Sequence, residues 1–157
     1  MDEGRDERGF LTAERVQGLF DRAVAHWNAR RFFEAHEDWE TIWHEAEGRR
    51  REWIQGLIQL AAAFHHVSRG TSSGFVKLVR SGSAKAEGYA GETHGLDFLD
   101  LWARLSPWRA HAERVAAGAP LAVDAPPDVP TLRYRPGVVP QPLPPEPEAG
   151  EDAGDDA

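Results

Sequence analysis

The sequence of 157 residues is 41% hydrophobic and includes six tryptophans, which is enough for one domain with a packed core. It contains no cysteine, which excludes disulfides, cysteine-ligated zinc and a thiol nucleophile, and suits the reducing cytoplasm, where we expect the protein. Six of its 26 acidic residues lie after position 145 with no base among them, so the other 20 nearly balance the 18 lysines and arginines. This balance gives no support to binding of nucleic acid.

The sequence also lacks the features of a secreted or membrane protein. The first ten residues are highly charged and contain no apolar stretch like that of a signal peptide. Nowhere do about 18 apolar residues follow one another, so we expect no transmembrane segment.

Hydrophobic periodicity predicts an all-α fold, a compact bundle of five to six helices. Thr12 is a good N-cap for the first helix, Gly48 is expected to end the second, and Ser106-Pro107 to begin the last. In chain order the predicted helices cover about 13–28, 32–47, 50–69, 74–89, 96–105 and 106–118.

The composition changes after Ala119, because ten of the eleven prolines lie between Pro120 and Pro147. We therefore predict a Pro-rich extended arm, laid on the bundle through Leu132, Tyr134 and Val138-Val139, and then a disordered acidic tail. The predicted division is a charged flexible segment at 1–10, the helical bundle at 11–118, the arm at 119–145 and the tail at 146–157.

The helix at 50–69 is apolar nearly all round, which is typical of a central helix. Its few polar residues are therefore informative, because an unpaired buried polar group costs about 1–3 kcal/mol. At 100° per residue, Gln55, Gln59 and His66 fall within about 40° of one another, with the small Ala62 beside them. On the preceding helix His36 lies at the border of the apolar face, and Glu40 lies about 40° from His36.

One interpretation of these residues is a divalent-metal site between the two helices. His36 and His66 would be ligands, Glu40 a ligand or orienting group, and Glu37 a general base for a water that the metal polarises. Glu34, Gln55 and Gln59 would complete the polar cluster. Glu40 stands where a His-Glu-x-x-His motif needs its second histidine, so the pattern does not predict zincin chemistry.

Two alternatives remain open at this level. The cluster is also explained as a buried polar network that fixes helix pairing in a non-enzymatic scaffold or interaction bundle, or as a metal-free ligand pocket. The sequence identifies no substrate and does not decide whether the bundle forms a homo-oligomer. The arginine runs Arg30-Arg31 and Arg49-Arg50-Arg51 are typical of solvated helix junctions, with contact to phosphate as the alternative.

Two motifs give the sequence a family resemblance. The segment 28–43, NARRFFEAHEDWETIW, is followed at 53–66 by WIQGLIQLAAAFHH and then by Arg69-Gly70. Together they resemble domain-of-unknown-function family 309, over roughly Val16 to Leu105. The resemblance implies a small all-helical bundle, in a family sometimes described as predicted metal-dependent hydrolases. Its family-like polar residues here would be Glu34, His36, Glu37, Glu40, Gln55, Gln59 and His66.

Overall fold

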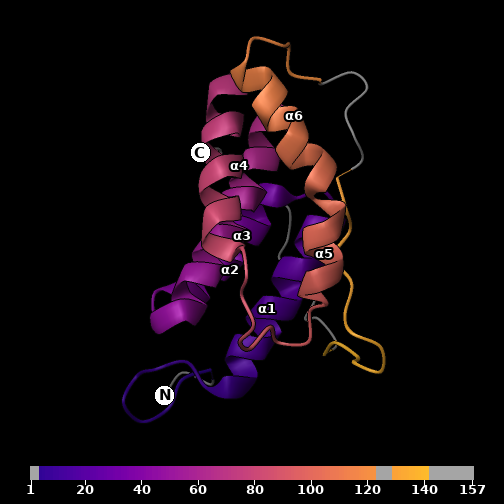
Figure 1. Cartoon of the computed structure of the whole chain (residues 1–157). Coiled ribbons are helices and arrows are strands. Elements are labelled where there is room, and N and C mark those ends of the chain that lie inside the picture. The colour runs from indigo at the N-terminus through magenta and orange to yellow at the C-terminus, as the bar shows by residue number, and fades with distance from the viewer. Residues whose placement is uncertain (1–3, 123–128, 142–157) are drawn as a thin grey trace.

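The computed structural model describes residues 4–122 and 129–141, and within them the chain is a bundle of six α-helices. No helix of this described part is long and apolar enough to cross a membrane. Figure 1 shows α1 to α4 packed side by side, with α5 and α6 following one another along the other side. The helices are α1 (Ala13–Asn28), α2 (Phe32–Trp43), α3 (Gly48–Ser68), α4 (Ser72–Ala86), α5 (Phe98–Arg104) and α6 (Ser106–Ala116).

The helix boundaries follow local chemistry at most ends. Helix α1 spans the predicted residues, and the Thr12 hydroxyl accepts a hydrogen bond from the Arg15 amide at 3.1 Å. The prediction for α2 was too long, because this helix ends at Trp43 and residues 44–47 reverse the chain. Gly48 begins α3 instead of ending α2. Its φ of +65° is one that glycine adopts without steric cost.

Helix α3 is the central helix, as predicted from the apolar residues on nearly all of its faces, and it packs against both α2 and α4. Two glycines let α3 and α4 approach closely. A Cβ on Gly82 would lie 2.9 Å from the Gly56 carbonyl oxygen, and a Cβ on Gly56 would lie equally close to the Gly82 oxygen. The backbones meet here because neither residue has a side chain.

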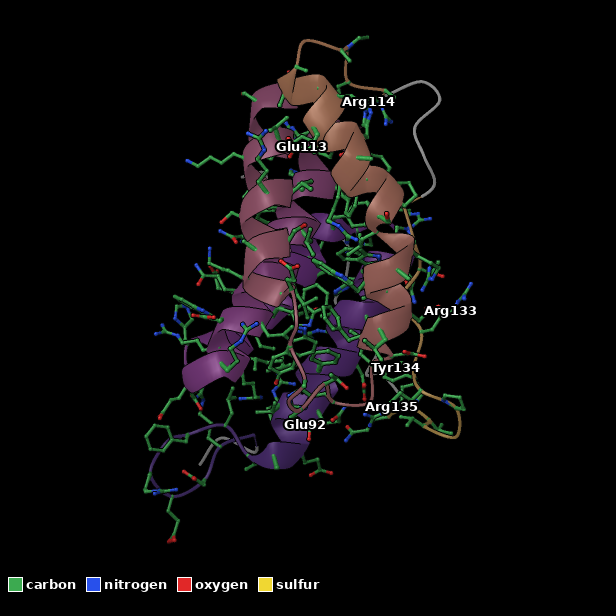
Figure 2. The ribbon with its side chains drawn as sticks, viewed as in Figure 1. Glu92, Glu113, Arg114, Arg133, Tyr134 and Arg135 are labelled. Atoms are coloured by element: carbon green, nitrogen blue, oxygen red, sulfur yellow. The ribbon has the colours of Figure 1, made fainter. Side chains whose placement is uncertain are left out.

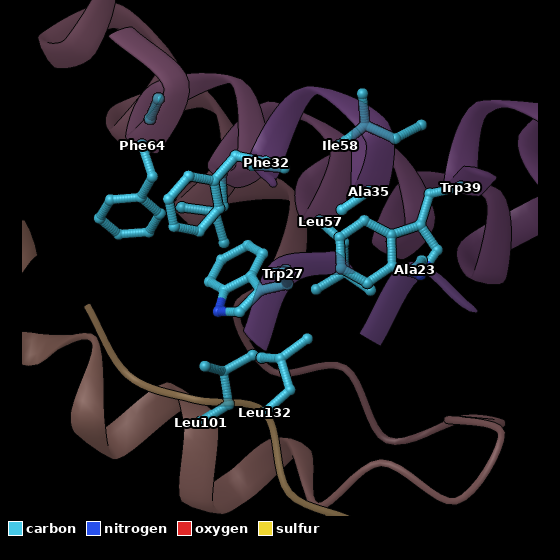
Figure 3. Packing of buried hydrophobic residues seen from close by; sticks show 14 of the residues in the cluster. Ala23, Trp27, Phe32, Ala35, Trp39, Leu57, Ile58, Phe64, Leu101 and Leu132 are labelled. Carbon is cyan, nitrogen blue, oxygen red and sulfur yellow. The ribbon is translucent and has the colours of Figure 1, made fainter. Parts of the chain in front are cut away.

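The core centres on Trp27, which is fully buried between helices and arm (Figure 3). Its ring meets those of Phe32 and Phe64 edge-on, each with a centroid distance of 5.4 Å. Leu101 of α5 and Leu132 of the arm lie on the opposite side of the indole. The arm therefore completes the core instead of only covering it.

The described part of the arm runs beside α1 and is held by its backbone. The Trp27 indole donates to the Pro130 carbonyl at 2.7 Å, and the Asn28 side chain exchanges two hydrogen bonds with the backbone of Leu132. Tyr134 pairs with Leu96 in an isolated antiparallel bridge.

These contacts confirm the predicted seating through Leu132 and Tyr134, whereas Val139 is 84% exposed and contributes nothing. The predicted acidic tail at 146–157 lies outside the described residues. Residues 4–10, part of the segment predicted to be flexible, form a turn whose Arg5 pairs with Glu45 at 2.9 Å.

Candidate functional site

The polar stripe of α3 lies along the contact between α3 and α4. A Cβ on Gly74 of α4 would come within 2.8 Å of the His66 ring, and one on Gly82 within 3.2 Å of the Gln59 Cβ. Gln55 is half-buried one turn before Gln59. Two glycines of α4 thus make room for two polar side chains of α3.

Helix α2 meets the other flank of α3 in antiparallel fashion. At one end the Arg51 guanidinium lies 4.0 Å from the centre of the Trp43 ring, and at the other the Phe33 ring lies 5.7 Å from that of His65. His36 is seven residues before Trp43, which by helix rise places it near the level of Ile58 and Gln59.

Three of the predicted site residues have a buried polar atom that lacks a hydrogen-bond partner within the described part of the chain. These atoms are Nδ1 of His36, Oε1 of Gln59 and Nδ1 of His66. The predicted network would have paired these side chains one with another, and the structure does not pair them. Each such group carries a desolvation cost of about 1–3 kcal/mol.

The predicted metal ligands are not gathered into one cluster. Nowhere in residues 4–122 and 129–141 do three histidine, aspartate or glutamate side chains form a group that could hold a metal ion. His66 lies against Gly74 of α4, whereas the His36 ring lies 5.5 Å from Phe33 of its own helix. Glu40, the third predicted ligand, is half-buried.

The other acidic residues predicted for the site lie toward the solvent. Glu37, predicted as general base, is exposed. Glu34 is half-buried and pairs with Arg31 at 3.3 Å. Burial lowers the pKa of the neighbouring His65, the charges of Arg69 and His66 lower it further, and Glu34 opposes them. A neutral His65 therefore fits the half-buried position it occupies.

Sequence reasoning missed the buried acid inside the motif, Asp38, which is 5% exposed. Its Oδ1 accepts from the Arg22 guanidinium at 2.9 Å, and its Oδ2 lies 2.8 Å from Nδ1 of His26. Both partners come from α1, so this carboxylate joins α1 to α2. A signal was present, because Asp38 falls between Ala35 and Ile42 on the buried face and Arg22 and His26 are four residues apart on α1.

A second buried acid, Asp21, was also missed. It is 2% exposed and accepts hydrogen bonds from Gln17, Tyr134 and the backbone of Gln141. The signal for it was weaker, because two of its partners lie more than a hundred residues away in the arm.

The arginine run at 49–51 has a packing role that neither interpretation of the sequence foresaw. Arg49 donates to the carbonyls of Lys85 and Glu87 at the end of α4, at 2.7 and 2.9 Å. Arg50 reaches His94 at 3.0 Å. These contacts fix the junctions between α3, α4 and the following loop.

The comparisons with known proteins agree with the motifs. No curated protein is similar enough to this chain to count as a match. Residues 20–78 match the family described as Domain of unknown function (DUF309). This segment runs from the second half of α1 through α2 and α3 into α4, and it includes both motifs and all seven predicted site residues. The match over residues 20–78 therefore agrees with the family that the two motifs resemble.

Proposed function

We propose that this chain is a non-enzymatic scaffold bundle, in which the polar residues of the DUF309 motifs set how the helices pack. The observation that carries the proposal is the Asp38 network. The buried carboxylate of the first motif contacts Arg22 and His26 of α1, so its charge serves to hold two helices together. The absence of cysteine fits our placement of this scaffold in the cytoplasm.

Other motif residues support the same proposal. Gln59 and His66 lie against Gly82 and Gly74 of α4, so both side chains occupy the packing contact between α3 and α4. Glu37 is exposed and Glu34 is engaged with Arg31, so neither lies in the buried surroundings typical of a general base.

Replacing the carboxylate tests the scaffold function. Asp38→Asn keeps the shape but removes the charge that Arg22 and His26 share, so we expect a loss of about 1–3 kcal/mol in the free energy of unfolding. Asp100→Asn is the matched control, because the Asp100–Arg104 pair is half-exposed and should cost below about 1 kcal/mol. Urea unfolding with and without EDTA measures both. Equal losses in the two variants, or a wild type that EDTA destabilises, would contradict the proposal.

A divalent-metal site is the second candidate, and one specific observation favours it. Nδ1 of His36, Nδ1 of His66 and Oε1 of Gln59 are all lone-pair atoms of ligand type that are buried without a partner in the described residues. His36 and His66 would hold the metal with Gln59 beside them, while Glu40 would orient a ligand and Glu37 would act as base. The fit is partial, because histidine and carboxylate groups in the described residues do not gather in threes. A bound metal would supply an activated water for hydrolysis.

Metal analysis separates the two candidates. Untagged protein purified without chelator should contain stoichiometric metal if the second candidate holds. Its thermal stability should rise with Zn²⁺, Mn²⁺, Fe²⁺ or Ni²⁺, and the rise should vanish in His36→Ala and His66→Ala. If the protein contains no metal and none of the four ions changes its melting temperature, the metal site is eliminated and the scaffold function is retained.

A further inference from the structure

The two buried aspartates differ in one respect that points to a ligand. Asp38 is paired with Arg22 and His26, whereas Asp21 forms no ion pair in the described part of the chain. Among residues 4–122 and 129–141, the donors to Asp21 are neutral. Its Oδ1 accepts from Gln17 Nε2 at 3.0 Å and from the Tyr134 hydroxyl at 2.7 Å, and its Oδ2 accepts, within these residues, only from the Gln141 amide at 3.0 Å.

This arrangement leaves the carboxylate short of one partner. A carboxylate accepts about four hydrogen bonds, so Oδ2, with a single donor, has a lone pair to offer. Buried charges in proteins are ordinarily paired with an opposite charge, because neutral donors only partly replace the lost hydration. Burial together with Asp21 raises the pKa of Tyr134, which therefore remains a neutral hydroxyl donor.

A cavity of about 190 Å³ lies beside this carboxylate, between α1 and the arm. Its lining includes Asp21, Val24, Ala25, Tyr134, Pro140 and Gln141. The volume exceeds the roughly 30 Å³ share of one water molecule and falls below the about 300 Å³ at which drug-sized pockets begin. Figure 2 shows Tyr134 on the arm between Arg133 and Arg135. The Tyr134 hydroxyl crosses from the arm to donate to Asp21 Oδ1 of α1.

We propose that this cavity binds a primary alkylammonium group, with its N–H donors on Oδ2 of Asp21. A short alkyl chain matches the apolar Val24, Ala25 and Pro140, and the Tyr134 ring offers a π-face that attracts cations. The site goes beyond the scaffold function. Its inner wall belongs to the DUF309 segment, but its outer wall is the arm, which lies outside that segment.

Titration of the full chain with ethylammonium chloride at constant ionic strength tests the site. We expect saturable shifts of the Val24 and Gln141 amide signals in ¹H–¹⁵N NMR spectra, and at least tenfold weaker binding by Asp21→Asn. Sodium chloride alone should produce no such shifts. Asp100→Asn, in which a half-exposed aspartate of α5 is changed, should bind as the wild type does. Equal binding by wild type and Asp21→Asn, or the same shifts with sodium chloride, would overturn the proposal.

A second variant keeps the test decisive if Asp21→Asn does not fold. Ala25→Leu fills the cavity and leaves Asp21 and its three donors in place, so it should abolish the shifts in a stable protein. Unchanged binding by Ala25→Leu would refute the site, as would equally tight binding of tetramethylammonium, which has no N–H donor. Nα-acetyl-lysine methylamide distinguishes the two possible sources of the alkylammonium group. Its binding would show that the cavity accepts a lysine side chain of a partner, and binding of ethylammonium alone would indicate a free small amine.

Discussion

At the scale of single residues, the informative contrast is between buried polar groups that have partners and those that have none. Gln17 donates from its amide both to Asp21 and to the His94 carbonyl, each at 3.0 Å. Gln59 keeps its amide oxygen buried without a partner in the described residues. Because an unpaired buried group carries its full desolvation cost, the two glutamines should respond oppositely to an apolar replacement.

Gln59→Met removes the unpaired oxygen and keeps an unbranched side chain of similar length. We expect the free energy of unfolding to stay level or rise by up to about 1 kcal/mol, while Gln17→Met should lose about 1–2 kcal/mol with its two hydrogen bonds. Urea unfolding of the metal-free protein measures both. A clear loss from Gln59→Met would mean that the oxygen has a hydrogen-bond partner in solution even without metal.

Helix periodicity could predict residues of this kind only in part. It placed Gln55, Gln59 and His66 on one stripe because all three lie on one regular helix. The same periodicity also places Asp38 on the buried face of α2, a signal that was missed. It could not find Asp21 as a buried acid, because the burial of Asp21 depends on partners from other elements. For Asp21 these partners are Tyr134 and Gln141 of the arm, which no local pattern connects to α1.

At the scale of elements, the contact of α3 with α4 depends on the absence of side chains at two positions. Gly82→Ala should gain about 1 kcal/mol in helix propensity but place its Cβ 2.9 Å from the Gly56 carbonyl oxygen. Since that atom is backbone, the helices must separate, and we expect a net loss of about 1–3 kcal/mol.

Gly18→Ala is the matched control for this prediction. It is also inside a helix, but its Cβ would meet only Gln141 Oε1 at 3.5 Å, an ordinary contact, so it should stabilise by up to about 1 kcal/mol. Thermal unfolding of the two variants provides the comparison. A stabilised Gly82→Ala would show that the close approach is not required.

The helices themselves were largely predictable. The boundaries of α2 and α5 differ from the prediction because each is set by contact with another part of the chain. Helix α1 has its predicted bounds because a capping threonine and a regular stripe define it locally. Helix α2 stops four residues early because the chain must turn at 44–47 for α3 to pack against it. Helix α5 likewise begins at Phe98 instead of near 96, since Leu96 and Asp97 pair with the backbone of the arm.

At the scale of the whole molecule, the loop at 87–97 connects the helical part to the arm. Asp97 donates from its backbone to the Arg133 carbonyl, and Arg135 donates to that of Gly95. His94 anchors this loop in the left-handed conformation, with φ +54°, its ring 4.9 Å from Phe20 and its Nε2 accepting from Arg50. Because Arg50 donates to this nitrogen, the ring serves the fold only while that nitrogen carries no proton.

This arrangement makes stability fall with acidification. Burial lowers the pKa of His94 and the adjacent Arg50 lowers it further, and burial also lowers the pKa values of His65 and His111. The unfolded chain takes up protons at the ordinary histidine pKa of about 6.5 before the folded chain does, so the unfolded state binds more protons as pH falls. Stability is therefore complete above about pH 7 and declines as pH drops through the lowered values of the folded state.

Urea unfolding at pH 8, 7, 6 and 5.5 measures this decline. His94→Asn removes the titrating group with a residue that tolerates the left-handed conformation, so its decline between pH 7 and 5.5 should be shallower than that of the wild type. His44→Asn changes an exposed histidine and should leave the slope unchanged. Parallel slopes for wild type and His94→Asn would mean that the folded protein accommodates a protonated His94. Acid would then weaken the bundle through groups other than the loop that holds its arm.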